Sequence, residues 1–368
     1  IKLFMIKFYS INKSDLKIRN KILKSIKYVI KNNNFINGSE VKKFEKNFSS
    51  YCGSKYAVSC SNGTDAITLS LKALNLKNNS EVIMPAMTYA STFYAIVNAG
   101  LKPVLVDINQ NNPLINLNEI KKKITNRTKV ILPVHLYGSV VDIPKLKKII
   151  KGRKIHIIDD CAQAHGALYK KNKRVGGHNI SNISTFSLYP GKNLGAYGDA
   201  GIITTNNYNY YKKILKMKNI GCEDKFNHET IGYNNRLDTV QAAILIHKLE
   251  RLDYLNKKRA VLSKIYFQRI NNPKVNFLNY TPFSVYHQFV IKVKNRKKFI
   301  KYMNDNKIEV GMHYPHTINQ MKYYRKNFKK LKFINAEKLA SQCVSLPIDP
   351  MLKKKEMDLI IKAINNFK

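Results

Sequence analysis

Three short segments of the sequence carry groups that could do chemistry, and each follows a short apolar run. In the first, Gly63 and Thr64 stand at the start of an apolar helical pattern. They offer free backbone N–H groups, a hydroxyl and the positive end of a helix dipole, which together suit a phosphate. An ordinary helix N-cap without a ligand fits these two residues equally well, and the spacing of a P-loop is absent.

The second segment places two acids, Asp159 and Asp160, at the end of the apolar run 155–158. Carboxylates this close to an apolar interior need a cationic partner. An aspartate here could bind a metal, act as a base or hold a protonated ring nitrogen. The further carboxylates that Mg²⁺ favours are missing nearby in the sequence, so we expect no metal.

The third segment, residues 186–201, is rich in glycine and aromatic residues and contains one lysine, Lys192. Enclosure lowers the pKa of a lysine, which suits an amine that must lose its proton to act as a nucleophile. An exposed loop lysine is the alternative for this residue alone. Together, a phosphate cradle, an acid at a strand end and an isolated lysine meet the requirements of pyridoxal phosphate.

The elements that must position these residues alternate between strands and helices. Short β-rich runs are predicted at Tyr56–Cys60, Glu81–Met84, Lys102–Asp107, Lys129–Pro133, Lys154–Asp159, Ile183–Ser187 and Ala200–Thr204. Helical or loop segments separate most of them, which indicates βαβ units and a mainly parallel sheet. Ligands bind at the carboxyl ends of the strands in such sheets, where the three segments lie.

Helical patterns precede these runs at Asp15–Asn33 and Ser39–Tyr51, and the pattern changes after a long helical stretch at Leu237–Arg269. A strand at Tyr286–Val293 and helices at Lys297–Asn306 and Lys354–Phe367 then predict a smaller α+β unit. We therefore expect a large α/β domain over residues 10–250 and a small C-terminal domain over residues 251–368.

The composition first suggests a polyanionic partner, because 65 Lys and Arg face 23 Asp and Glu, a net charge of +42. Only ten of the basic residues are Arg, and the lysines are spread along the chain, which is typical of a solvated surface. No helix-turn-helix or basic stripe with interleaved aromatic residues is visible, so nucleic-acid binding is not expected.

Cysteine spacing and apolar runs bear on the compartment. Five cysteines, an odd number without C-x-x-C spacing, argue against a disulfide framework and a zinc site. No apolar run is long enough to cross a membrane, and no signal peptide is visible. We expect a cytoplasmic protein, with Met5 as a plausible native start.

Ten segments of the sequence resemble the sugar-nucleotide aminotransferase family of the DegT/StrS type, within the fold type I pyridoxal-phosphate enzymes. The resemblance runs in order from about residue 10 to the end of the chain. The segments are FINGSEVKKFE, YAVSCSNGTDA, VIMPAMTYAST, PVHLYG, IIDDCAQAHGA, FSLYPGKNLGAYGDAG, GYNNRLDTVQAAI, HQFVI, HYPHTINQ and VSLPIDP.

The resemblance implies roles around the cofactor ring. Lys192 matches the lysine that attaches the cofactor covalently and later moves the proton between cofactor and substrate carbons. Asp160 matches the acid that keeps the pyridine nitrogen protonated. Gln163 matches the residue that contacts the 3-hydroxyl, and Tyr89 matches the aromatic residue stacked on the ring.

The resemblance also implies two phosphate contacts. Gly63, Thr64 and Ser187 match the phosphate anchor within the chain. Asn234 and Arg236 lie in a segment that reaches the cofactor phosphate of the neighbouring subunit in this family, so a homodimer with shared sites is implied. Whether Asn234, Asn235 or Arg236 makes that contact stays open.

The implied reaction is transamination of a nucleotide-linked keto sugar with L-glutamate as the amino donor, for surface polysaccharide or glycoside biosynthesis. Tyr189, His313 and Tyr314 match positions near the sugar in relatives that aminate carbon 3, which favours a 3-keto over a 4-keto dTDP- or UDP-sugar. Some relatives are sugar dehydratases in which a histidine replaces the lysine, and the presence of Lys192 disfavours that activity.

Overall fold

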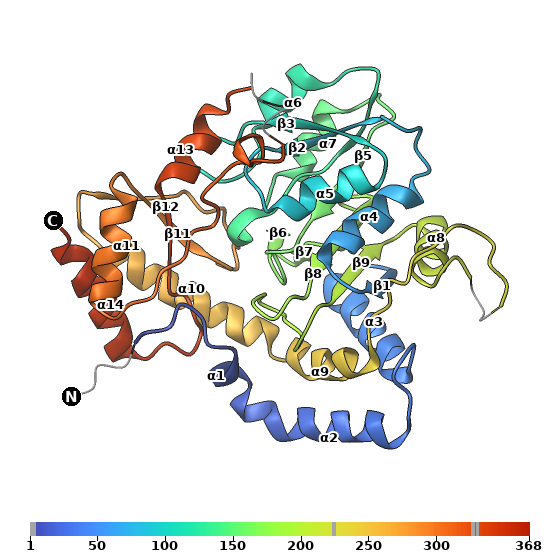
Figure 1. Ribbon diagram of the computed structural model, residues 1–368, viewed down its shortest axis with the longest axis horizontal. Helices are drawn as coiled ribbons and strands as arrows, with labels where there is room; N and C mark the ends of the chain where they lie inside the picture. Colours follow the sequence, from blue (N-terminus) through green and yellow to red (C-terminus); the bar gives the residue numbers. More distant parts are fainter. Residues whose placement is uncertain (1–4, 223–225, 325–327, 329–330) are drawn as a thin grey trace.

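The computed structural model describes residues 5–222, 226–324, 328 and 331–368, so the four residues before Met5 lie outside the described residues. Its centre is a seven-stranded sheet with the strand order β1-β9-β8-β5-β4-β2-β3 (Figure 1). The strands are β1 Tyr56–Cys60, β2 Glu81–Pro85, β3 Lys102–Val106, β4 Thr128–Ile131, β5 His156–Asp160, β8 Ile183–Ser187 and β9 Gly201–Thr205. All seven predicted strands are confirmed, with ends that shift by at most two residues.

The sheet is mixed but mainly parallel, as the sequence predicts. Only β9 runs against its neighbours, pairing antiparallel with both β1 and β8, while the other strand pairs of this sheet are parallel. The carboxyl ends of β5 and β8 are therefore adjacent at one edge of the sheet. This adjacency brings the segment after Asp160 beside the segment after Ser187.

Alternating side chains on the strands build two hydrophobic layers. On β2, Val82 and Met84 pack into the core shared with helices α4 (Gly63–Ala73) and α5 (Ala90–Asn98), while Ile83 packs on the opposite face. The opposite face is covered there by α6 (Leu117–Lys123) and α7 (Ile143–Ile149). This two-residue period is the pattern of a strand buried on both faces.

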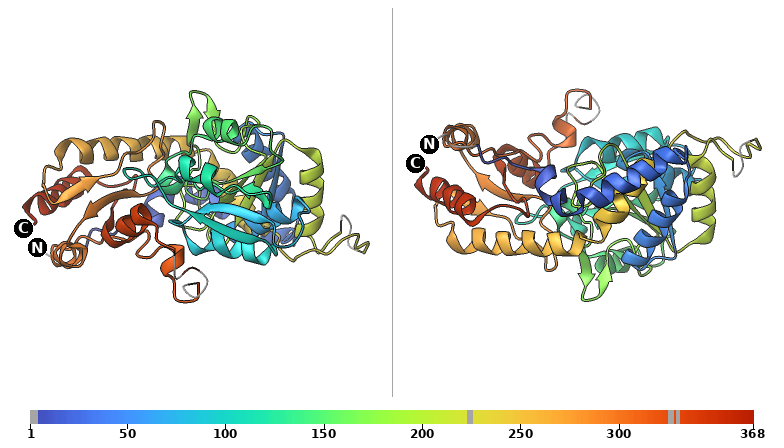
Figure 2. Two further views of the ribbon diagram at one scale, coloured as in Figure 1. Left: turned by 90° about the horizontal axis from the view of Figure 1, so that it is seen from above. Right: turned by 90° about the horizontal axis from the view of Figure 1, so that it is seen from below.

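The other half of the sheet is covered in the same way. Ile203 on β9 packs toward α8 (Tyr208–Lys218), and Ile202 packs toward α3 (Ser39–Cys52) and α9 (Thr239–Leu249). The smaller unit, which holds the C-terminus, lies at one end of the molecule (Figure 2).

The smaller unit is a three-stranded antiparallel sheet with helices packed on it. The strands are β10 Val275–Phe277, β11 Phe289–Val293 and β12 Cys343–Leu346. Their core is shared with α10 (Leu252–Arg269), α11 (Arg296–Asp305) and α14 (Lys354–Asn366). Ile6 joins this core and pairs with Ile308, so the N-terminal segment returns to the C-terminal unit.

The structure differs from the sequence prediction at three places. The helix expected at Leu237–Arg269 is two helices, because α9 buries its apolar residues against α3 whereas the second half of α10 buries its own in the smaller unit. The helix expected at Asp15–Asn33 is divided into α1 (Ile11–Asp15), a 3₁₀ turn (Leu16–Ile18) and α2 (Arg19–Lys31).

The third difference is the strand expected at Tyr286–Val293, which starts only at Phe289. Tyr286 has a φ of 45°, a left-handed conformation that no strand residue adopts. The strand therefore cannot include Tyr286. The residues between Tyr286 and β11 lie outside the strand, and one of them, His287, makes a contact described below.

The remaining elements are short or peripheral. They are the hairpin strands β6 (Leu168–Lys170) and β7 (Lys173–Arg174), the 3₁₀ turns η2 (Leu136–Gly138) and η3 (Ile318–Gln320), and helix α13 (Ile334–Gln342). All five cysteines are free and buried. Among the described residues, no helix has both the length and the apolar character needed to cross a bilayer.

Candidate active site

Lys192 and Asp160 lie at the carboxyl ends of β8 and β5, where their charges interact. Asp160 is the last residue of β5 and is only 5 % exposed, and Lys192 is partly buried in the loop after β8. Burial lowers the pKa of Lys192 to about 8, and the Asp160 charge opposes this shift. The amine is therefore much easier to deprotonate than a solvated lysine, as the sequence predicts.

Hydrogen bonds hold the Asp160 carboxyl in one orientation. It accepts from the Ala162 backbone N–H at 3.1 Å and from Thr92 Oγ1 at 2.9 Å. Burial raises the pKa of Asp160, while these bonds and Lys192 favour the charged form. The sequence analysis missed Thr92. Thr92 follows Thr88 by four residues, and the two hydroxyl oxygens lie 2.9 Å apart.

A close approach brings Gly63 next to Ser187, two of the residues predicted to anchor a phosphate. Gly63 begins α4, and a Cβ added to it would lie 2.6 Å from the Ser187 Cβ. Asn62 caps the helix by accepting from the Asp65 N–H, so in the described part of the chain the N–H groups of Gly63 and Thr64 are left without a partner at the helix end. Such groups bind an anion.

Gln163, Tyr314 and Tyr89 form a connected wall of the site. Gln163 accepts from the Tyr137 N–H at 2.7 Å and donates to the Tyr314 hydroxyl at 2.8 Å. The Tyr314 ring lies 5.5 Å from the ring of Tyr89, which is 59 % exposed at the start of α5. The exposed face of Tyr89 leaves room for a stacked ring.

The residues predicted near a sugar lie at the rim of this site. Tyr189 is 57 % exposed, and His313 bonds to Ser345 Oγ at 2.8 Å and stacks on Phe8 at 5.6 Å. Burial lowers the pKa of His313 to about 4, with a further contribution from Lys192, so this imidazole is neutral at pH 7.

A buried amide network fixes the loop that carries Lys192. Asn193 donates to Asn256 Oδ1 at 2.9 Å and to the Val285 carbonyl at 3.2 Å, and its Oδ1 lies 3.0 Å from His287 Nδ1. Asn256 in turn donates to the His165 carbonyl. Sequence reasoning missed these roles, although Asn193 and His287 both lie in the segments that carried the resemblance.

Asn234 and Arg236 belong to a segment outside the strand ends that carry the rest of the predicted site. They occupy the segment between α8 and α9, where Asn234 pairs with Asn219 and the Asn235 N–H donates to the Lys218 carbonyl. Among the described residues, no hydrogen bond or ion pair joins Asn234 or Arg236 to Lys192, Gly63 or Ser187.

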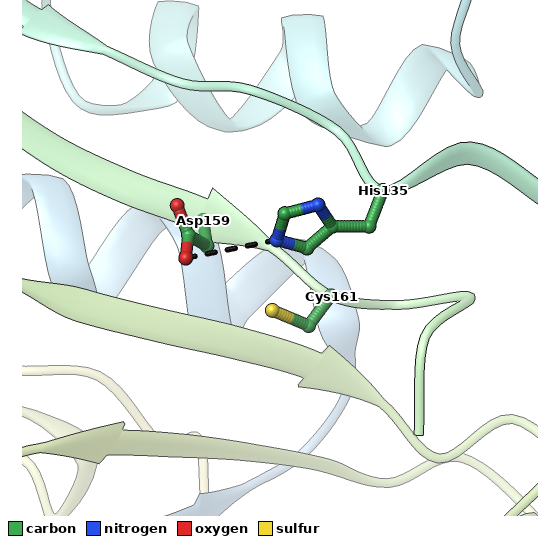
Figure 3. Close-up of side chains that lie close together, drawn as sticks. All are labelled: His135, Asp159 and Cys161. Atoms are coloured by element: carbon green, nitrogen blue, oxygen red, sulfur yellow. Dashed lines mark ion pairs between the residues drawn. The ribbon is translucent and has the colours of Figure 1, made fainter. Parts of the chain in front are cut away.

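His135, Asp159 and Cys161 lie close together beside the site, fully buried, with possible ligand atoms within 4.8 Å of one another (Figure 3). Hydrogen bonds already occupy most of these atoms. His135 Nδ1 accepts from the Val141 N–H at 3.0 Å, and the Tyr169 hydroxyl donates to Asp159 Oδ2. We therefore interpret the cluster as a hydrogen-bonded support for the end of β5 rather than as a metal site.

The geometry fits pyridoxal phosphate. The Gly63 and Ser187 cradle can hold a phosphate, the Asp160 carboxyl can face a ring nitrogen, and Lys192 can supply the amine. These groups come from three different strand ends and meet on one side of the sheet, so the three sequence-predicted segments belong to a single site.

The chain was compared with curated proteins and solved structures. It is 38 % identical to the dTDP-3-amino-3,6-dideoxy-alpha-D-galactopyranose transaminase of Aneurinibacillus thermoaerophilus, covering 99 % of each chain. It is 32 % identical to the UDP-2-acetamido-2-deoxy-3-oxo-D-glucuronate aminotransferase of Pseudomonas aeruginosa, covering 98 % of this chain and 100 % of the relative.

The fold agrees with these relatives. A structure of Streptomyces venezuelae DesV in complex with a ketimine intermediate superposes with a TM-score of 0.95 at 31 % identity, covering 98 % of each chain. Bacillus subtilis NtdA with the bound cofactor PMP gives 0.91 at 29 % identity, covering 99 % of this chain and 85 % of that one. Because the sequence model of the family also matches residues 16–365, the chain belongs to the DegT/DnrJ/EryC1/StrS aminotransferase family.

Proposed function

We propose that this protein is a pyridoxal-phosphate-dependent transaminase that moves the amino group of L-glutamate to carbon 3 of a nucleotide-linked keto sugar. The observation that carries the proposal is the electrostatic interaction of a partly buried Lys192, with its lowered pKa, and a buried Asp160, together with the close approach of Gly63 to Ser187 at a helix end. Two relatives described above are named for amination at carbon 3, which supports that position.

The cofactor, when bound, supplies an electron-accepting ring that stabilises negative charge on the carbon that loses a proton. The Asp160 carboxylate, which Thr92 and the Ala162 N–H keep in place, would hold a proton at the ring nitrogen. Gly63, Thr64 and Ser187 would hold the phosphate. Gln163 has a second amide hydrogen, beyond the one donated to Tyr314, with which it can bind the 3-hydroxyl.

Lys192 moves the proton. As a neutral amine Lys192 would take the proton from the α-carbon of the amino donor, and the resulting ammonium would hold that proton for the next transfer. In the second half of the cycle the same amine works in the opposite direction on the sugar carbon. Its pKa of about 8 lies close to neutral pH, so both protonation states are accessible during turnover.

We further propose that the active unit is a homodimer. Among the described residues, no hydrogen bond or ion pair joins Asn234 or Arg236 to Lys192 of the same chain, which fits the role of a segment that completes the phosphate site of a second copy. We also place the boundary between the two domains near residue 250, where α9 ends and the path of the chain turns into α10.

The substrate assignment is tested with the purified enzyme, L-glutamate and nucleotide sugars that carry the keto group at carbon 3 or carbon 4. We expect the 3-keto dTDP- or UDP-sugar to give an amino sugar nucleotide, detected by mass spectrometry, and Lys192→Ala to give none. Amination of the 4-keto sugar alone would overturn the position. An active Lys192→Ala variant would overturn the whole proposal.

A further inference from the structure

Three contacts hold His313 in one orientation at the rim of the site. The ring of Phe8 stacks on its imidazole, with 5.6 Å between the ring centroids and 20° between the ring planes. The hydroxyl of the buried Tyr137 donates to the His313 carbonyl. The backbone of Gly311 lies against one edge of the imidazole, since a Cβ added to Gly311 would be 2.8 Å from His313 Cε1. The ring therefore has little freedom to turn.

Ser345 fixes the position of the hydrogen on this ring. Its Oγ lies 2.8 Å from His313 Nδ1, a distance at which either atom could donate. Ser345 is 0 % exposed, and among the described residues its hydroxyl has no other hydrogen-bond partner. If Nδ1 carried the hydrogen, the serine hydroxyl hydrogen would be buried without an acceptor, which costs free energy. The serine therefore donates and Nδ1 accepts.

The second ring nitrogen of His313 is left as a donor. Burial and, to a smaller extent, the Lys192 charge lower the pKa of His313 to about 4, so the ring is neutral at pH 7. A neutral imidazole carries one N–H, which lies on Nε2 when Nδ1 accepts. In the described part of the chain Nε2 has no hydrogen-bond partner, and unlike the ring nitrogens of His165 it is not fully buried. A ligand can therefore reach it.

We infer that Ser345 is a positioning residue that holds His313 as a hydrogen-bond donor to an oxygen of the nucleotide sugar. The inference rests on the proposed function, in which His313 lies near the sugar. It gives the imidazole a direction, because Nε2 donates to an acceptor oxygen and takes no proton from a hydroxyl group. Ser345 is fully buried on β12 and acts only through His313.

The tautomer is tested without any substrate. The holoenzyme is labelled with nitrogen-15 in its nine histidine rings, and the signals of His313 are identified by their loss in His313→Gln. At pH 7 we expect the chemical shift of a protonated nitrogen for Nε2 and that of an unprotonated nitrogen for Nδ1. The preference should weaken in Ser345→Ala, because Nδ1 loses its donor. A proton on Nδ1 in the wild type, or a charged ring, would overturn the inference.

The effect on the substrate is tested by separating the two half-reactions. The enzyme loaded with pyridoxal phosphate is mixed with L-glutamate, and the aminated enzyme is then mixed with the nucleotide keto sugar. Ser345→Ala should need about 3- to 10-fold more sugar for the half-maximal rate, and His313→Ala about 10- to 100-fold more. In both variants the loss should fall on the sugar half-reaction, with the glutamate dependence within about threefold of the wild type.

Ser263→Ala is the matched control. Ser263 is also 0 % exposed, and its hydroxyl donates to the Ala260 carbonyl on α10 at 2.8 Å, so the variant removes a buried hydroxyl outside the site. We expect it to match the wild type in both half-reactions.

Free dTDP or UDP, used as an inhibitor, distinguishes the two possible acceptor oxygens. If Ser345→Ala and His313→Ala weaken inhibition as much as they weaken the use of the sugar, Nε2 donates to a phosphate oxygen. If inhibition is unchanged, the acceptor belongs to the sugar. Both results support the inference, since each leaves His313 as a donor to the nucleotide sugar.

The double variant Ser345→Ala/His313→Ala separates a positioning role from a structural one. Because Ser345 acts through His313, the double variant should need no more sugar than His313→Ala alone. Additive losses, or an equal loss in the glutamate half-reaction, would overturn the inference. An unchanged sugar dependence in His313→Ala would also overturn it, while continued amination would leave the proposed function intact. A wild type that aminates no keto nucleotide sugar would instead overturn the proposed function, whatever the tautomer measured without substrate.

Discussion

Lys192 shows how a single residue acquires reactivity from its surroundings. The chain has 65 Lys and Arg, and the lysine after β8 lies at the carboxyl end of the sheet, where its charge interacts with the buried Asp160 carboxyl. Burial lowers its pKa to about 8, while the Asp160 charge raises it and so limits the shift. The amine is thus tuned by two opposing effects, and each can be changed separately.

The rate at which the apoenzyme takes up pyridoxal phosphate should rise with pH, with a midpoint near 8, because only the neutral Lys192 amine attacks the aldehyde. In Asp160→Asn the carboxylate that favours the ammonium is gone, so the midpoint should move to lower pH. Visible absorbance followed from pH 6 to 10 would measure both.

Asp358→Asn, which removes an exposed acid at the far end of the molecule, is the control and should keep the wild-type midpoint. A wild-type midpoint near that of a solvated lysine, or an upward shift in Asp160→Asn, would contradict the electrostatic account. The pH dependence of Asp160→Asn is the more discriminating measurement, because the direction of its shift depends only on the interaction between the Asp160 carboxylate and the Lys192 amine.

At the scale of elements, the Lys192 loop is held by three segments that are distant in the sequence. Asn193 reaches Asn256 on α10 and the Val285 carbonyl, and His287 before β11 closes the network. The two halves of the fold therefore meet directly behind the reactive amine. The loop geometry depends on how the smaller unit packs on the larger one.

Asn193→Ala should reduce the free energy of unfolding by about 2 to 4 kcal/mol, because it leaves buried groups of Asn256, Val285 and His287 without partners. Urea denaturation would measure the loss. Asn32→Ala, in which the lost amide bonds only to the Tyr28 carbonyl on the surface, should change stability by less than about 0.5 kcal/mol. Equal losses in both variants would mean that the network does not hold the loop.

The strands were predictable from sequence because short apolar runs bounded by turns are typical of strands buried on both faces. The break between α9 and α10 was not predictable from sequence. Both helices are apolar on one face, and only their different packing partners distinguish them. Residue type alone misleads at Arg259, which directly follows Lys257 and Lys258 but is buried, because its spacing from Leu255 and Leu262 places it on the buried face of α10.

The site itself was predictable to the extent that its groups lie at strand ends. Gly63, Asp160 and Lys192 follow three separate strands, and the parallel order of the sheet brings them together. Contacts such as Thr92 with Asp160 join positions 68 residues apart, so they require the packing of α5 on the sheet. Local spacing carries no such information.

For the whole molecule, the net charge of +42 is the least specific feature. Among the described residues, Lys218 and Lys248 are the buried lysines, and the other lysines are exposed or half-buried. A diffuse positive field accelerates the encounter with an anionic nucleotide sugar without selecting it. Specificity must come from the site and from whatever a second subunit adds.

The proposed sharing of sites between two subunits can be tested by mixing variants. In a dimer of one Lys192→Ala chain and one Arg236→Ala chain, the intact Lys192 meets the intact Arg236 only if the arginine serves the partner's site. Co-refolding equal amounts of the two inactive or weakened variants should then restore about a quarter of the wild-type activity, since about half of the dimers are mixed and each holds one complete site.

If Arg236 acts within its own chain, every site in the mixed dimer lacks one of the two residues, and the mixture is no more active than the average of its parts. Lys192→Ala mixed with Asp160→Asn is the control pair, because both positions belong to one chain's site and no dimer can combine the intact copies. Restoration in the first pair and not in the second would show that the segment between α8 and α9 belongs to the neighbouring site.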